Sequence, residues 1–138
     1  MSLPLIDKAM YIADHAHAGQ FRRDEVTPYI RHVEKVVENV KKRDGISDEI
    51  IVAWLHDVIE DTTITVDELK IHFPCHIVEA VIALTHIEDE PYEASILRAK
   101  ANPIARQVKI ADNLANLSDS PTDKQILKYA KSLQELMT

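Results

Sequence analysis

One apolar segment, AWLHDVIEDT at residues 53–62, constrains this chain more than any other part of its sequence. It sets an imidazole, His56, beside a carboxylate, Asp57, among side chains that belong in a helical core. Polar groups in such surroundings cost free energy unless a partner satisfies them, and a metal ion would satisfy both. Two further candidate ligands, His32 and Asp112, occur in TPYIRHVEKV and VKIADNLANL, which also read as apolar helices. The sequence therefore indicates a helical core built around a metal site.

Two more carboxylates, Glu60 and Asp61, follow His56 and Asp57 at a distance of four residues. Residues four apart share a face of a helix, so an uninterrupted helix would carry both pairs on one stretch of its surface. Carboxylates this close repel one another unless a cation lies between them. Beside a cation, a carboxylate can also orient an attacking water or accept its proton. We therefore interpret Glu60 and Asp61 as candidates for the chemical step.

Candidate substrate contacts lie outside the 53–62 segment. Arg22 and Arg23 form a basic pair in the loop before His32, and the guanidinium fork suits phosphate oxygens. Asn116 shares a helix face with Asp112, where its amide can hydrogen-bond a ligand or substrate group. Each of these residues, taken alone, is equally explained by a solvated loop, a helix cap or a satisfied core group. Three segments of the chain, however, each supply a residue of a metal-ligating type. Together they favour a metal site over a different structural explanation for each residue.

Helical spacing dominates the whole chain and no segment shows a convincing strand pattern. The sequence predicts a single all-α domain over residues 1–138, a bundle of seven or eight helices. A first helix is expected at 3–17, and a second is expected to be capped by Thr27 with Pro28 in its first turn. A central buried helix should run from Ser47 through the 53–62 segment, followed by a short helix capped by Thr65 and by helices that begin at Pro74 and Pro103. The last helix should begin at about Lys124, and its inward-facing residues should be Ile126, Ala130, Leu133 and Met137.

The charge of the chain limits its partners. Its formal net charge of −7 argues against a long nucleic acid, which needs a basic surface. A small anionic ligand is compatible with this charge, because a few arginines in a pocket suffice. Cys75 is the only cysteine, and the sequence has neither a signal peptide nor an apolar run of membrane-spanning length, so we expect a cytoplasmic location and no membrane partner. The sequence leaves open whether the chain forms a homo-oligomer.

Three segments, HAHAGQFRRDEVTPYIRHVEKV, AWLHDVIEDT and KIADNLANL, resemble in this order the motifs of the RelA/SpoT-type hydrolase domain. That family is a branch of the HD superfamily of metal-dependent phosphohydrolases, and it removes the 3′-pyrophosphate of the alarmone (p)ppGpp with Mn²⁺. The resemblance spans roughly residues 13 to 118. It implies an HD-domain helical fold and a stand-alone guanosine-3′,5′-bis(diphosphate) 3′-pyrophosphohydrolase. The ligand types, imidazole and carboxylate without thiolate, also suit Fe²⁺, Co²⁺ or Zn²⁺.

The resemblance implies a role for each matching residue. It implies that Glu60 and Asp61 act on the attacking water. It also implies that Arg22 and its basic neighbour Arg23 contact the substrate, and that Asn116 lines the substrate pocket. The metal ligands implied are His32, His56, Asp57 and Asp112.

The sequence departs from the family pattern in three places. The loop after Arg23 reads DEVT in place of a glycine turn, Val33 replaces a common proline, and the third motif carries Asn113, Ala115 and Ser118 in place of bulkier or basic residues. These departures spare the candidate ligands and fall where nucleotide contacts are expected. Two alternatives therefore stay open. One is an HD-domain phosphohydrolase acting on another nucleotide, such as ppApp or a nucleoside monophosphate. The other is a non-catalytic alarmone-binding module.

Overall fold

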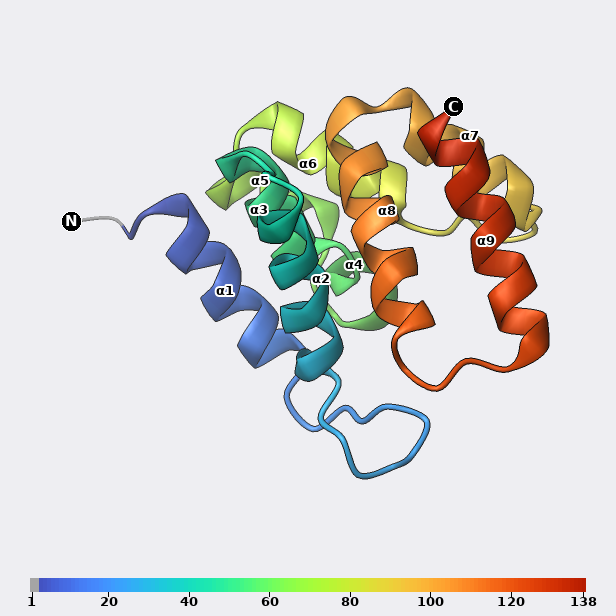
Figure 1. The fold of residues 1–138 in the computed structure, drawn as a ribbon. Helices are drawn as coiled ribbons and strands as arrows, with labels where there is room; N and C mark the ends of the chain where they lie inside the picture. The colour runs from blue at the N-terminus through green and yellow to red at the C-terminus, as the bar shows by residue number, and fades with distance from the viewer. Residues whose placement is uncertain (1–2) are drawn as a thin grey trace.

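Two helices, α3 (Ser47–Leu55) and α8 (Pro103–Leu117), pack against each other and against most of the other helices (Figure 1). The computed structural model describes residues 3–138. Its helices are α1 (Leu5–Ala16), α2 (Ile30–Lys42), α3 (Ser47–Leu55), α4 (Val58–Asp61), α5 (Val66–His72), α6 (Cys75–Leu84), α7 (Tyr92–Ala101), α8 (Pro103–Leu117) and α9 (Asp123–Met137). The only extended pairing in this part of the chain is an isolated bridge between Phe21 and Pro28. The all-α prediction is confirmed.

The main hydrophobic core lies where α1, α2, α3, α6 and α8 meet. Valines from one side of α2, among them Val33 and Val37, are buried against the apolar centre of α3 and the inner face of α8. A smaller cluster of Ile96, Ile110 and Leu136 joins α7, α8 and α9. Because α8 contributes to both clusters, its position is fixed from two sides, and Asp112 on this helix is fixed with it.

The central helix predicted from Ser47 through residue 62 is divided in two. Helix α3 ends at Leu55, α4 begins at Val58, and Asp57 between them has φ −111° and ψ 0°. The reason is local, because the His56 ring donates through Nδ1 to the carbonyl oxygen of Ala53, 2.7 Å away. The expectation of one uninterrupted helix is wrong here. His56 and Asp57 lie at a turn between two helices, and the described chain has nine helical segments.

Several predicted helix ends agree with the structure. Thr65 caps α5 by accepting from the backbone N–H of Glu68, and Pro103 opens α8 beside a cap from Asn102. The predicted Thr27 cap is wrong, because α2 begins only at Ile30. The Thr27 hydroxyl instead donates to the Asp24 carboxylate, 2.6 Å away, within the loop.

The inward stripe predicted for the last helix is wrong at three of its four positions. Helix α9 buries Ser132 and Leu136, while Ile126, Ala130 and Met137 are exposed; of the predicted residues only Leu133 packs against the smaller cluster. The Ser132 hydroxyl donates to the Tyr92 hydroxyl on α7, and this contact helps to set the rotation of α9. No helix within residues 3–138 is long and apolar enough to cross a membrane.

Candidate metal centre

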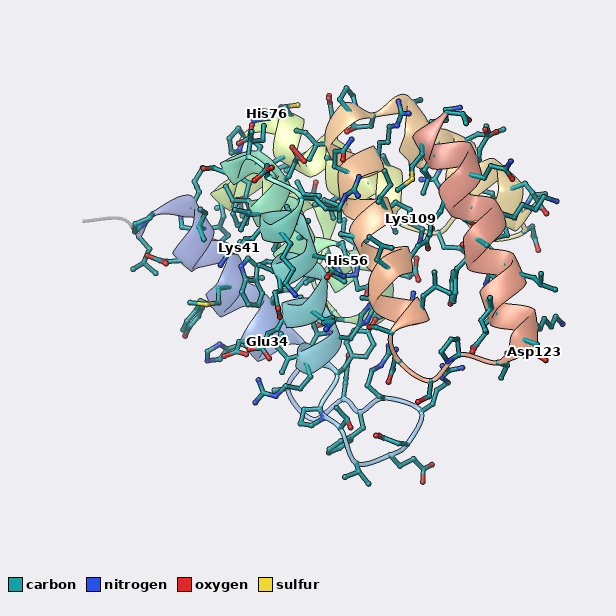
Figure 2. All side chains as sticks on the ribbon, in the orientation of Figure 1. Glu34, Lys41, His56, His76, Lys109 and Asp123 are labelled. Carbon is teal, nitrogen blue, oxygen red and sulfur yellow. The ribbon has the colours of Figure 1, made fainter. Side chains whose placement is uncertain are left out.

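Four of the predicted site residues meet at the centre of the fold. His32 comes from α2, His56 and Asp57 from the turn between α3 and α4, and Asp112 from α8. Figure 2 shows His56 in the interior of the bundle, whereas His76 lies at its periphery. The donor atoms of His32, His56 and Asp57 all lie within 4.8 Å of one another. Asp112 Oδ1 is 2.9 Å from His32 Nε2 and 3.7 Å from His56 Nε2.

The contacts of His56 leave one nitrogen for a ligand. A carbonyl can only accept, so the bond to Ala53 requires the proton to be on Nδ1. The other nitrogen, Nε2, is buried and has no hydrogen-bond partner among the described residues, although Asp57 Oδ2 is only 2.9 Å away. An imidazole held through Nδ1–H with Nε2 free is the usual arrangement of a metal-ligating histidine. The donor set of two imidazoles and two carboxylates therefore fits a divalent cation.

The charges at the turn support the same interpretation. Burial acts to lower the pKa of His56, but the Asp57 carboxylate outweighs burial and raises that pKa to about 9. Burial acts to raise the pKa of Asp57, but His56 outweighs it and lowers that pKa to about 2. Asp57 is therefore ionised at neutral pH and requires positive charge beside it. A divalent cation would supply that charge in place of the imidazolium proton.

Lys109 on α8 adds a fixed positive charge. Its ammonium group lies 3.2 Å from Asp112 Oδ2, the oxygen that does not face His32. Burial acts to raise the pKa of Asp112, but Lys109 and the neighbouring imidazoles hold it well below its usual range. Lys109 lies about one helical turn before Asp112 on α8. Its contact assigns one carboxylate oxygen of Asp112 to Lys109 and leaves the other facing the histidines.

The two outer carboxylates lie beside Asp57 but have different partners. Oxygens of Asp57, Glu60 and Asp61 come within 4.8 Å of one another. Glu60 Oε1 accepts from the backbone N–H of His86 at 2.6 Å, which ties α4 to the segment between α6 and α7. Burial, followed by the charges of Asp57 and Glu60, raises the pKa of Asp61 to about 6. Asp61 is thus a stronger base than Asp57, whose pKa is lowered to about 2.

Two cavities adjoin the four residues. The acidic cavity, of about 200 Å³, reaches His56, Asp57, Glu60 and Asp112, and its other lining residues are Leu84, His86, Tyr92, Ser95, Val108 and Lys109. The arginine cavity, of about 230 Å³, lies on the side of His32 and the loop, and its other lining residues are Arg22, Asp24, Thr27, Arg31, Lys35, Ala115, Ser118 and Asp119. A ligand that bridged both cavities would pass the candidate metal centre.

The predicted substrate contacts differ in how close they lie to the site. Arg22 lines the arginine cavity, and its Nη2 lies 2.8 Å from Asp119 and 3.5 Å from the Asn116 side-chain oxygen. Arg23 is exposed and lies outside both cavities of the described chain. The structure therefore brings Arg22 and Asn116 together and does not bring Arg23 to the site.

Three contacts at the site escaped the sequence interpretation. The Tyr29 hydroxyl donates to Asp57 Oδ2 at 2.5 Å, and burial, followed by the Asp57 charge, raises the pKa of Tyr29. The Gln20 amide donates to the backbone oxygen of Asp61 at 2.7 Å, and Asp119 pairs with Arg22. The only available signal was that Tyr29 and Gln20 belong to the first motif and Asp119 follows the third.

Comparisons with known proteins show the family to which this chain belongs. A scan against protein families matches residues 9–136 to a family described as HD domain. The guanosine-3′,5′-bis(diphosphate) 3′-pyrophosphohydrolase MESH1 of Mus musculus is 36% identical to this chain over 120 residues, which are 81% of this chain and 67% of that protein. The protein of the same name from Drosophila melanogaster is 32% identical over the same shares of both chains.

A solved structure shares the fold. It belongs to a metazoan orthologue of SpoT that hydrolyses ppGpp, and it superposes with a TM-score of 0.80, covering 99% of this chain and 88% of its own. At 24% sequence identity this likeness concerns the fold. The overall arrangement of the helices is thus one already seen in that orthologue.

Proposed function

We propose a function from the premise that this chain belongs to the HD domain family, which its match over residues 9–136 and its 36% identical relative establish. The chain is a metal-dependent (p)ppGpp 3′-pyrophosphohydrolase, formed as a single HD domain over residues 1–138 and working in the cytoplasm. The observation that carries the proposal is the meeting of His32, His56, Asp57 and Asp112 beside a cavity that contains Arg22. The names of the relatives supply the substrate.

His32, His56, Asp57 and Asp112 are the proposed metal ligands, and Mn²⁺ is the proposed ion. When bound, a divalent cation supplies Lewis acidity, which polarises a phosphoryl oxygen and lowers the pKa of a coordinated water. The ligand set supports the proposal because imidazole and carboxylate suit Mn²⁺ and no thiolate is present.

Protein groups would carry the remaining steps. Glu60 and Asp61 orient the attacking water and accept its proton, and the raised pKa of Asp61 suits a base. The water oxygen forms a bond to the phosphorus that is attached to the ribose 3′-oxygen. The bond between this phosphorus and the ribose 3′-oxygen breaks. The ribose oxygen takes up a proton, so the products are GDP or GTP and pyrophosphate. Arg22 neutralises phosphate charge and Asn116 hydrogen-bonds the nucleotide.

Product analysis tests this proposal directly. Purified protein loaded with Mn²⁺ is incubated with ppGpp, pppGpp, ppApp and a nucleoside monophosphate, and the products are separated and identified. We expect pyrophosphate together with GDP from ppGpp, and no reaction after the metal is removed with a chelator. Turnover of ppApp or of a nucleoside monophosphate in place of ppGpp would favour the other phosphohydrolase. Binding of ppGpp without cleavage of any nucleotide would favour the binding module.

Replacing Arg22 with alanine is expected to raise KM for ppGpp while the Mn²⁺ content stays unchanged. Losing a hydrogen bond to a charged group costs roughly 1.5–3 kcal/mol, which corresponds to about 10–160-fold in affinity. Steady-state kinetics and elemental analysis measure the two quantities. Arg43→Ala serves as the control, because Arg43 follows the far end of α2 and the change removes the same charge. An unchanged KM in Arg22→Ala would remove this residue from the substrate site.

Asp119 provides the complementary change. Its carboxylate holds the guanidinium of Arg22 at 2.8 Å, so it competes with a phosphate for the same donor. We expect Asp119→Asn to lower KM for ppGpp, because the arginine is then free to bind the anion. A higher KM in Asp119→Asn would instead give Asp119 a direct part in binding.

Arg23→Ala is expected to change KM less than Arg22→Ala, since Arg23 lies outside the cavity.

A further inference from the structure

Tyr29 links two parts of the site that lie far apart in the sequence. It immediately precedes α2, and its hydroxyl donates to Asp57 Oδ2 across 28 residues of sequence. The same Asp57 oxygen lies 2.9 Å from His56 Nε2. A carboxylate with one oxygen held by a fixed donor has a restricted rotation. The Tyr29 hydroxyl therefore determines which oxygen lone pairs of Asp57 are available to a cation.

The Tyr29 ring supports the neighbouring functional groups. Its centre is 5.0 Å from the His17 ring and 5.6 Å from the His32 ring. The guanidinium carbon of Arg22 lies 5.7 Å from the centre of the same ring, within the range of a cation–π contact. One side chain thus contacts a proposed metal ligand through its hydroxyl and the proposed phosphate arginine through its ring.

The position of Tyr29 is itself fixed by the preceding loop. Its backbone N–H donates to the carbonyl oxygen of Gln20 at 2.8 Å. The Gln20 side chain is held at both ends, by the His17 ring at 2.8 Å and by the backbone oxygen of Asp61 at 2.7 Å. The loop that carries Arg22 is therefore joined to both ends of α4. This arrangement leaves Tyr29 little freedom to release Asp57.

We propose that Tyr29 is a positioning residue whose hydroxyl holds Asp57 for cation binding and whose ring supports Arg22. The proposal rests on the proposed function for the identity of the cation and the substrate. Partners that orient metal ligands commonly contribute roughly 10–100-fold to metal affinity. The hydroxyl and the ring make separate contacts, so their contributions can be separated by substitution.

Isothermal titration of metal-free protein with Mn²⁺ tests the hydroxyl. Tyr29→Phe keeps the ring and removes the donor, so we expect it to weaken Mn²⁺ binding by roughly 10–100-fold. At saturating Mn²⁺, its KM for ppGpp should stay close to that of the wild type. Tyr29→Leu removes the ring as well and should both weaken Mn²⁺ binding and raise KM. Circular dichroism and thermal unfolding establish that both variants are folded before titration.

Tyr11→Phe is the matched control, because Tyr11 is an exposed tyrosine on α1 and the same atom is removed. Its Mn²⁺ affinity should equal that of the wild type. If Tyr29→Phe binds Mn²⁺ within about twofold of the wild type, the proposal for Tyr29 is wrong, whatever the substrate. If the wild type binds Mn²⁺ but hydrolyses no nucleotide, only the proposed function fails, and weaker binding by Tyr29→Phe still supports the role of Tyr29. If the wild type binds no Mn²⁺, both proposals fail.

Discussion

Replacing Asp57 with alanine is expected to remove the bound cation and nearly all activity while the protein stays folded. Asp57 contacts both His56 and Tyr29, and Asp57 is ionised because its pKa is lowered to about 2. The loss should exceed the 10–100-fold that is typical for removing a contact that only supports a ligand. Elemental analysis of the purified variant measures the ion, and circular dichroism measures the helical content.

The surface of the protein offers a control with the same chemistry. Asp48 on α3 pairs with His76 at 3.0 Å, but both side chains are exposed. Asp48→Ala therefore removes an aspartate from a histidine pair without affecting the candidate centre, and it should keep both the ion and the activity. Full metal content in Asp57→Ala, at the level of Asp48→Ala, would show that the cation is held elsewhere.

Signals that act between near neighbours in the sequence predicted much of the fold. Thr65 and Pro103 mark their helix starts through contacts or conformations within three residues, so the sequence is sufficient to find them. The residues of α9 that face inward could not be predicted in this way. They depend on which face meets Tyr92 and the smaller cluster, and a helix with apolar residues on more than one side does not specify this.

The sequence likewise predicts some parts of the candidate site and not others. His56 and Asp57 could be predicted because a polar pair in an apolar segment is conspicuous without any tertiary information. The turn that holds them could not, since the bond from His56 to Ala53 replaces part of a helix whose composition favours continuity. The contacts of Tyr29 with Asp57 and of Arg22 with Asp119 span 28 and 97 residues. Spacing within one helix carries no information about contacts between such distant segments.

The acidic pair is expected to serve the chemical step and not the retention of the metal. In a Glu60→Gln, Asp61→Asn double variant we expect kcat for ppGpp to fall by roughly 10²–10⁴-fold, the range for losing general acid–base assistance. The amides keep the shapes of the carboxylates, so Mn²⁺ content and KM should stay near those of the wild type. Steady-state kinetics and elemental analysis together separate these outcomes.

Single variants then assign the base. Glu60 is engaged by the backbone N–H of His86, whereas Asp61 has its pKa raised to about 6, so we expect Asp61→Asn alone to account for most of the loss in kcat. Asp67→Asn with Glu68→Gln is the matched control, because it makes the same two isosteric changes at exposed positions on α5. That control should turn over ppGpp at the wild-type rate. Near-normal turnover in the Glu60→Gln, Asp61→Asn variant would place the base elsewhere, since no carboxylate would then remain at either position to accept the proton of the water.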